Sequence, residues 1–226
     1  MSAVSISSRG NRKNRKNRER RAKMKTLRQL IGSMSLLVLL LDPVPSGAND
    51  DTTGILKGKV EIGSGRKDQS TVVYLQGVQG DYKPPQQAAV LDQKDRMFMP
   101  HLLPVQRGQT VRFTNSDPFS HNVYLFWGGR SRFVQAQPPG RHADWTATGP
   151  GEYVVLCTLH PEMSAVILVL DHPFYSEAGD SEFTIENIPA GTYTLVAVRD
   201  VRGNLERKET QVTIKGGETT NVVIQY

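Results

Sequence analysis

The chain contains very little cysteine: Cys157 is the single one among 226 residues. An internal disulfide is therefore excluded. In an oxidising compartment a lone thiol is either buried or held by a metal, because an exposed one invites pairing between molecules. The sequence also lacks a long apolar run. The uncharged, mostly apolar stretch at residues 30–41 has twelve residues, whereas a helix that spans a bilayer needs about twenty.

Basic residues gather at the start of the chain. Residues 1–29 contain eleven Lys or Arg and one acid. With the apolar run that follows and the small residues at 46–48, this arrangement predicts a secretory signal at residues 1–48, cleaved between Ala48 and Asn49. Translation from Met24 would give a signal of ordinary length. The alternative is an uncleaved leader that anchors the chain to a membrane.

Positive charge is scarce in the rest of the chain. Beyond residue 48 there are 17 Lys or Arg against 20 Asp or Glu, a formal charge of −3. The formal charge of +6 for the whole chain therefore belongs to the leader. Because no basic stripe is left elsewhere, we expect no nucleic-acid partner.

After the leader no helical hydrophobic period is found, and short β-rich segments alternate with turn residues. We therefore predict an all-β fold. The expected strands are residues 57–62, 71–76, 102–105, 110–115, 122–127, 153–157 and 165–170. Residues 82–95 are expected to form a loop or at most one helical turn, and residues 127–140 a long loop.

A possible metal site lies in the stretch that holds the cysteine. Cys157, His160 and Met163 follow one another at intervals of three, between two expected strands, so they share one short loop. His121 opens another expected strand. One thiolate, two imidazoles and one thioether are the ligand set of a blue-copper electron-transfer centre, in which the thioether binds weakly on the axis.

Residues 57–171 resemble a cupredoxin, and the C-x2-H-x2-M loop is most similar to that of amicyanin-type copper proteins. The resemblance implies a Greek-key β-sandwich with one type 1 copper per chain. It also implies that His121, Cys157 and His160 are the equatorial ligands and that Met163 is the axial one.

The same resemblance extends to residues around the ligands. Asn122 matches an asparagine that ties the upstream strand to the loop after the cysteine, and Thr158 would be its partner. Leu159 and Glu162 depart from the family pattern, which has a proline and an apolar aromatic residue there. Glu162 would place a carboxylate beside the copper, which should favour Cu(II) and lower the reduction potential.

The C-terminal segment has its own character. Residues 182–197, with a Pro-x-Gly turn before a strand led by tyrosine, resemble a transthyretin-like or carboxypeptidase-regulatory-like β module, and further strands are expected at 211–214 and 221–225. We place a copper domain at 52–171 and this module at 172–226. In the alternative, the tail pairs with the N-terminal strands and the copper fold is an insertion. The combined order resembles methylamine-utilisation-like proteins.

The sequence thus predicts an exported, periplasmic copper protein that carries single electrons between redox protein partners. We expect no enzyme, because a copper with all positions filled cannot easily bind substrate. The alternatives are a copper-delivery or copper-storage module, and a structural or binding β protein with a vestigial site. Among the other histidines, His101 is expected to be an exposed strand residue, with a methionine-rich copper-entry surface as its alternative. His142 and His172 are expected to be solvated.

Overall fold

The structure is a computed structural model that describes residues 52–63, 71–178, 181–201 and 204–226. The predicted leader and its cleavage site lie outside the described residues. Within these ranges every regular element is a strand, so the predicted all-β fold class is confirmed. No helix among the described residues is long and apolar enough to cross a membrane.

Strands β3 to β11 form a sandwich of two sheets. One sheet has the order β4-β3-β6-β9 and the other β5-β11-β10-β7-β8. Successive strands such as β5, β6 and β7 alternate between the sheets, as in Greek-key sandwiches. Their bounds are β3 Ala89–Lys94, β4 Met97–Met99, β5 Leu102–Gln106, β6 Thr110–Asn115, β7 His121–Trp127, β8 Arg130–Gln137, β9 His142–Thr146, β10 Gly151–Leu156 and β11 Ser164–Leu170.

The core of this sandwich follows from the alternation of side chains along its strands. On β10 the side chains of Tyr153 and Val155 are buried, and those of Val154 and Leu156 are largely exposed. Cys157 continues the inward series by one more step, and it lies in the same buried cluster as Met163. The local strand pattern therefore delivers the thiol to the inner end of the sandwich.

The remaining strands form two more sheets with a separate buried cluster between them. One sheet has the order β13-β1-β16 and the other β12-β2-β14-β15. The bounds are β1 Thr53–Glu61, β2 Thr71–Gln76, β12 Tyr175–Glu177, β13 Glu182–Pro189, β14 Gly191–Val201, β15 Asn204–Ile214 and β16 Thr219–Gln225.

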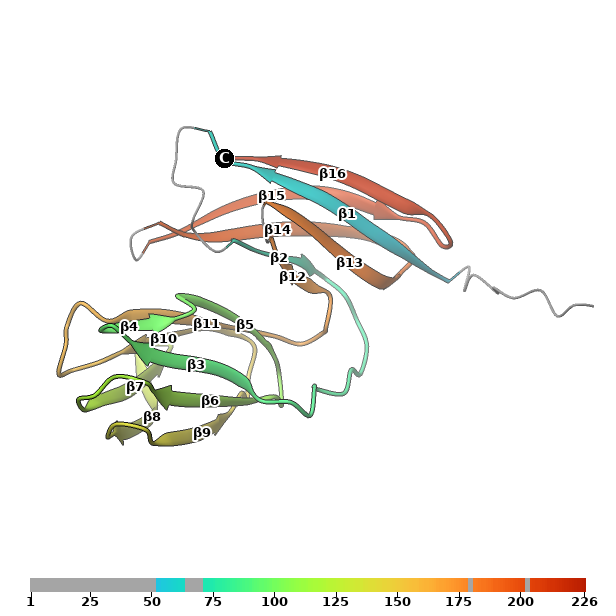
Figure 1. Cartoon of the computed structure of the whole chain (residues 1–226). Coiled ribbons are helices and arrows are strands. Elements are labelled where there is room, and N and C mark those ends of the chain that lie inside the picture. The colour runs from blue at the N-terminus through green and yellow to red at the C-terminus, as the bar shows by residue number, and fades with distance from the viewer. Residues whose placement is uncertain (1–51, 64–70, 179–180, 202–203) are drawn as a thin grey trace, which may run out of the picture. The chain divides into compact units, whose positions relative to one another are not determined.

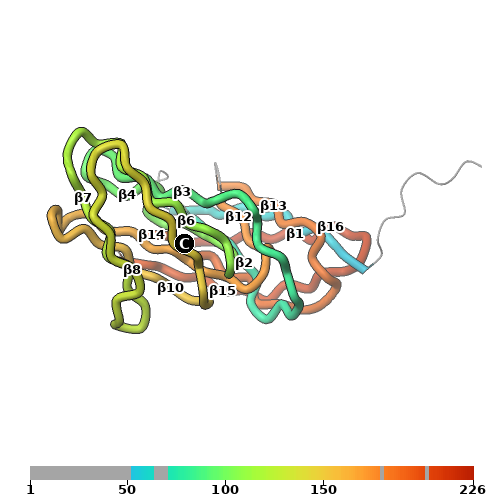
Figure 2. The backbone as a smooth tube through the Cα atoms, turned by 90° about the horizontal axis from the view of Figure 1, so that it is seen from below, coloured from blue at the N-terminus to red at the C-terminus, as the bar shows by residue number. Residues whose placement is uncertain are grey.

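The first two strands of the described chain pair with the last ones. β1 is antiparallel to β13 and parallel to β16, and β2 is antiparallel to β12 and β14. Both views show β1, in cyan, beside β16, in red (Figures 1 and 2). This pairing differs from the expected boundary, which grouped residues 52–76 with the copper domain. It corresponds to the alternative, in which the β3–β11 sandwich is inserted between β2 and β12.

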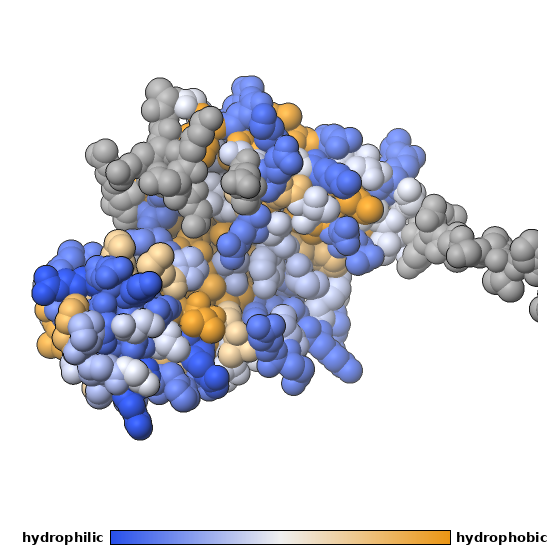
Figure 3. Space-filling model, in the orientation of Figure 1, coloured by the Kyte–Doolittle hydropathy of each residue, from blue (hydrophilic) through white to orange (hydrophobic). Residues whose placement is uncertain are grey.

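A third buried cluster combines side chains of β2 and β14 with side chains of β5 and β11. Its members are Val72, Tyr74, Leu102, Leu168, Leu170, Val196 and Val198. On the face of the molecule drawn in Figure 3, hydrophilic residues dominate, and smaller hydrophobic patches show between them. Because the third cluster covers one side of β11 and the sandwich core covers the other, β11 is buried along most of its length.

Two expected loops contain strands, so both predictions were wrong. Residues 82–95 include β3, and residues 127–140 include β8. β8 is an almost fully exposed edge strand, and its polar sequence hides the hydrophobic alternation. It pairs with β7 across the two-residue turn Gly128-Gly129, where both glycines have positive φ. Such a pair is a typical hairpin turn, because both central residues of a type I′ turn require φ above zero.

Candidate metal centre

The loop from Cys157 to Met163 joins β10 to β11, which pair side by side. Its backbone is closed by two hydrogen bonds, Cys157 N to Met163 O at 3.3 Å and Met163 N to His160 O at 2.9 Å. Both ends of the loop are thus held by neighbouring strands, and His160 is carried on a tight turn between them. Cys157 and Met163 are 2% and 1% exposed, and His160 is half-buried.

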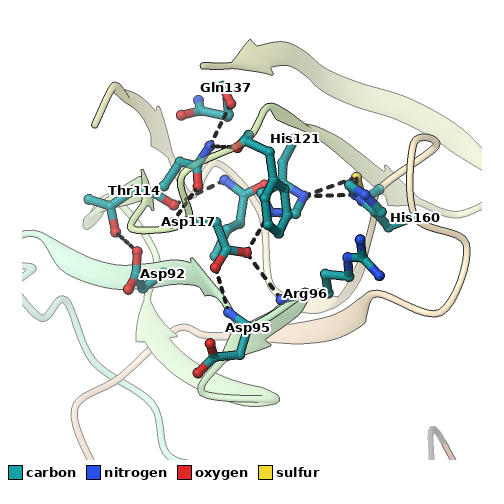
Figure 4. A network of polar contacts seen from close by, with 12 residues as sticks. Asp92, Asp95, Arg96, Thr114, Asp117, His121, Gln137 and His160 are labelled. Atoms are coloured by element: carbon teal, nitrogen blue, oxygen red, sulfur yellow. Dashed lines mark hydrogen bonds and ion pairs between the residues drawn. The ribbon is translucent and has the colours of Figure 1, made fainter. Parts of the chain in front are cut away.

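Strand β7 brings His121 to the same place, with 1% of its surface exposed. The Nδ1 atoms of His121 and His160 lie 3.0 Å apart, and each lies 3.9 Å from the Cys157 sulfur. The three donor atoms therefore lie within 4.8 Å of one another, the one His/Cys/Asp/Glu cluster of this kind among the described residues. Figure 4 shows the His160 ring facing His121 beside the yellow sulfur atom.

These separations fit a metal ion at the centre of the trio. First-row metals such as zinc bind imidazole nitrogen at about 2.0 Å and thiolate sulfur at about 2.3 Å. Ligand atoms around such an ion are then roughly 3–4 Å apart, which matches the three distances here. Two imidazoles with one soft thiolate suit copper in particular. The buried side of the trio is the apolar core, and its outer side is the edge of His160.

Asp117 is a part of the site that sequence analysis missed. Its Oδ2 lies 2.7 Å from His121 Nε2, and both side chains are almost completely buried. The carboxylate accepts a hydrogen bond from Nε2–H, which leaves the lone pair on Nδ1 free for a metal. Carboxylate–histidine pairs of this kind fix the tautomer and ring orientation of metal ligands. The sequence signal was an acid four residues before His121, in a Pro-containing turn.

The same carboxylate also holds the turn between β3 and β4. Asp117 accepts hydrogen bonds from the backbone N–H of Asp95 at 2.7 Å and of Arg96 at 3.1 Å. Burial alone would raise the pKa of Asp117, but these two amides and His121 outweigh it and lower that pKa. Asp95 and Arg96 have φ of 54° and 57°, a costly conformation for residues other than glycine. The carboxylate therefore stabilises this turn and His121 together (Figure 4).

Asn122 and Thr158 tie the two ligand-bearing segments together. The side chain of Asn122 donates from Nδ2 to Thr158 Oγ1 at 2.7 Å, and its Oδ1 accepts from the Thr158 backbone N–H at 2.8 Å. Two hydrogen bonds thus link the residue after His121 to the residue after Cys157. This fixes the start of β7 against the start of the ligand loop.

The remaining loop residues face outward. Leu159 is 56% exposed and Glu162 is exposed. The ring of Phe119 contacts His121 and His160, with ring centroids 5.1 and 5.7 Å apart. The guanidinium of Arg96 lies 5.3 Å from the Phe119 ring. The rim around His160 therefore carries a cation and an anion as well as apolar side chains.

The other histidines lie away from the trio. His101 is half-buried and pairs with Asp200, Nδ1 to Oδ2 at 3.0 Å. His142 is exposed on β9. The expectation that His172 is solvated was wrong, because it is 6% exposed and its Nδ1 accepts the Phe174 backbone N–H at 3.2 Å. Burial lowers the pKa of His172. The proline beside it had suggested an open loop, whereas the segment crosses between two sets of sheets.

No family model matches the chain. The chain is 30% identical over 114 residues to the methylamine utilization protein MauL of Methylophilus methylotrophus, and this covers 48% of the chain and 66% of that protein. A copper-containing nitrite reductase (NirK) from Thermus scotoductus SA-01 is 29% identical at a TM-score of 0.35, over 42% of this chain and 25% of the enzyme.

Two small copper proteins are also similar in structure. A purple cupredoxin from Nitrosopumilus maritimus is 21% identical at a TM-score of 0.34, over 36% of this chain and 99% of its own. An oxidised amicyanin variant is 26% identical at a TM-score of 0.35, over 37% of this chain and 82% of its own.

Proposed function

We propose that the chain is a cupredoxin-like protein with one type 1 copper, which carries single electrons between redox proteins. The observation that carries this proposal is the convergence of His121 Nδ1, Cys157 Sγ and His160 Nδ1 within 4.8 Å at the end of a rigid sandwich. Bound there, copper would supply a one-electron couple. Met163, which is buried in the same hydrophobic core as Cys157, would be the weak axial ligand.

Two of the proposed ligands are buried and one is partly exposed, which suggests different roles for them. Cys157 and His121 are buried, and the core and the Asp117 and Asn122 hydrogen bonds would keep them in place in both oxidation states of a bound copper. A site that does not rearrange suits electron transfer. His160 is only half-buried and would be the point at which a partner approaches. Glu162, exposed on the same loop, would favour Cu(II) modestly, because solvent screens an exposed charge.

Three further parts of the proposal concern the setting of this site. Three converging donors and a methionine would fill the copper, so we propose no enzymatic activity. Export to the periplasm is proposed from the leader pattern at residues 1–48. The seven strands outside the sandwich are proposed to be a transthyretin-like module that carries the copper domain as an insertion.

A visible spectrum tests the central claim. Cu(II) added to the copper-free chain should give an intense visible band from thiolate-to-copper charge transfer, and Cys157→Ser should abolish it. Leu159→Ala, in the exposed part of the loop, is the matched control and should keep the band. A band that survives in Cys157→Ser contradicts the ligand assignment. Tight, colourless Cu(I) binding without a Cu(II) band would instead indicate copper delivery or storage.

A further inference from the structure

The short strand β4 exposes two methionines. Met97 and Met99 are 43% and 48% exposed, and Phe98 between them is completely buried. Because side chains alternate along a strand, both thioethers lie on the outer face of the sheet. β4 is the edge strand of its sheet. Both sulfur-bearing side chains are therefore accessible from solvent.

A carboxylate lies on the same face. Asp92 of β3 is directly opposite Met99 in the antiparallel register, and its Oδ1 accepts a hydrogen bond from the Thr114 hydroxyl at 2.6 Å. Opposite Cβ atoms in such a pair are about 4.5–5.5 Å apart and diagonal ones about 7–8 Å, within reach of long side chains. Asp92 thus faces Met99 directly and Met97 diagonally. Lys94, opposite Met97, is a cation on this face, and Arg112 of β6 is another, paired with Asp144.

This cluster is joined to the candidate metal centre by the β3–β4 turn. Met97 follows Arg96, whose backbone N–H is bound by the Asp117 carboxylate that also binds His121. The Arg96 side chain lies over Phe119, whose ring contacts His160. The exposed methionines therefore begin one residue beyond a turn that is fixed to the site.

We propose that Met97 and Met99, with the negative charge of Asp92 beside them, form a second, exposed and weaker site that binds Cu(I). Thioethers are soft ligands and select Cu(I) over harder divalent ions. Two flexible thioethers beside one carboxylate at a solvated edge should bind less tightly than a buried thiolate with two imidazoles. This inference rests on the proposed function, because the role of such a site is to receive Cu(I) before it enters the buried one.

Competition with a chromophoric Cu(I) chelator, under anaerobic conditions, tests the proposal on the full chain. We expect one tightly held equivalent and a second, weaker one. Met97→Leu with Met99→Leu should abolish the second equivalent and leave the first, because leucine keeps the volume and removes the sulfur. Each single substitution should weaken the second equivalent by roughly tenfold or more. Val90→Leu, an exposed apolar position on β3, is the control and should change neither.

The site of the second equivalent can be read directly by NMR. The chain has six methionines, and with 13C-labelled methyl groups the signals of Met97 and Met99 should shift during the second equivalent. A second equivalent that leaves both signals unchanged, or survives the double substitution, overturns the proposal, as does the absence of any second equivalent.

A substitution in the buried site separates the two claims. In Cys157→Ala the first, tight equivalent should disappear, while the shifts of the Met97 and Met99 methyl signals persist. Loss of those shifts in Cys157→Ala would show that the methionines respond to the buried site and bind no metal themselves. A chain that never binds the tight equivalent, yet shifts these methyl signals, would contradict the proposed function and leave the methionine site standing.

Discussion

At the scale of single residues, the candidate site depends on one carboxylate as much as on its expected ligands. His121, Cys157, His160 and Met163 were predicted from the sequence, because their residue types match a copper ligand set and three of them share one short loop; the structure brings His121, Cys157 and His160 together. Asp117 was not, since nothing in the sequence shows that the turn at residues 95–96 folds onto it. Its three hydrogen bonds become visible only when β3, β6 and β7 are placed together.

Replacing Asp117 with Asn should therefore weaken the copper site. The variant loses the negative charge against the His121 imidazole, which favours Cu(II), so the reduction potential should rise. Copper affinity should fall by roughly 10–100-fold, as for other residues that orient a metal ligand. Voltammetry and competition with a copper chelator measure both quantities.

The control for this substitution is Asp144→Asn. Asp144 lies on β9 and pairs with Arg112 of β6 at 2.8 Å on the surface. It removes the same charge without touching His121, and should leave potential and affinity nearly unchanged. Equal shifts in both variants would contradict a specific role for Asp117. Asp117→Glu keeps the carboxylate, so its potential and copper affinity should lie closer to those of the natural chain than the values of Asp117→Asn do.

At the scale of elements, strands rich in apolar and aromatic residues were predictable, and strands with an irregular mixture of polar and apolar residues were not. β2 and β6 were expected with the bounds that the structure shows, because Val, Tyr and Phe alternate or cluster there. β3 and β8 were taken for loops because their apolar and polar residues do not follow burial: Val90 and Val134 are exposed, whereas Gln93 and Gln137 are buried. The Gly128-Gly129 turn could have revealed β8, whereas the Asp95-Arg96 turn depends on the distant Asp117 carboxylate.

One local device is repeated in the two halves of the structure. Tyr153 donates its hydroxyl to Gly149 O at 3.0 Å, and Tyr193 donates to Pro189 O at 3.0 Å. In both cases a glycine lies two residues before the tyrosine. At Gly191 an added Cβ would lie 2.9 Å from the Tyr193 hydroxyl, so the ring would have to shift. This arrangement resembles the tyrosine corner of β-sandwiches.

Tyr153→Phe should lower the free energy of unfolding of the sandwich by about 1 kcal/mol, the usual value of one buried hydrogen bond. Trp127 and Trp145, the two tryptophans of the chain, both contact Tyr153, so tryptophan fluorescence in urea reports this unfolding. Tyr193→Phe should leave the fluorescence midpoint almost unchanged, because its hydrogen bond belongs to the other sheets. Equal effects of the two substitutions on fluorescence would contradict this assignment.

At the scale of the whole chain, strand pairing brings together segments that are far apart in sequence. The sequence left open whether the tail pairs with the N-terminal strands, because a residue pattern cannot show which strands pair. β1 could be a strand of either sheet system, and only its ladders with β13 and β16 decide the question. The predicted boundary at residue 172 followed the order of the motifs along the chain. It missed that strands before and after the β3–β11 sandwich pair with each other.

His172 lies where the chain returns from the inserted sandwich to the other sheets. It follows β11 and precedes β12, its Nδ1 accepts the Phe174 N–H, and its ring stacks on Phe174, with centroids 5.8 Å apart. Desolvation by burial is the main cause of its lowered pKa, against opposing effects of the Leu75 backbone and Asp171. The buried His172 ring is favoured in its neutral form, because protonation would place a positive charge in a largely desolvated environment.

The free energy of unfolding should therefore decrease as the pH is lowered, and His172 should cause part of this decrease. The unfolded chain has the ordinary histidine pKa of about 6.5 and the folded chain a lower one. The contribution is complete above about pH 6.5, and it is lost as the pH falls from there through the folded pKa, because the unfolded state binds the proton first. The free energy of unfolding of the copper-free chain can be measured in urea at pH 7 and at pH 5. Between these two values it should drop more for the natural chain than for the His172→Asn variant, whose side chain keeps an acceptor but cannot titrate. His142→Asn, at an exposed histidine, should behave like the natural chain. If His172→Asn instead shows the same loss between the two pH values as the natural chain, His172 does not control this acid sensitivity.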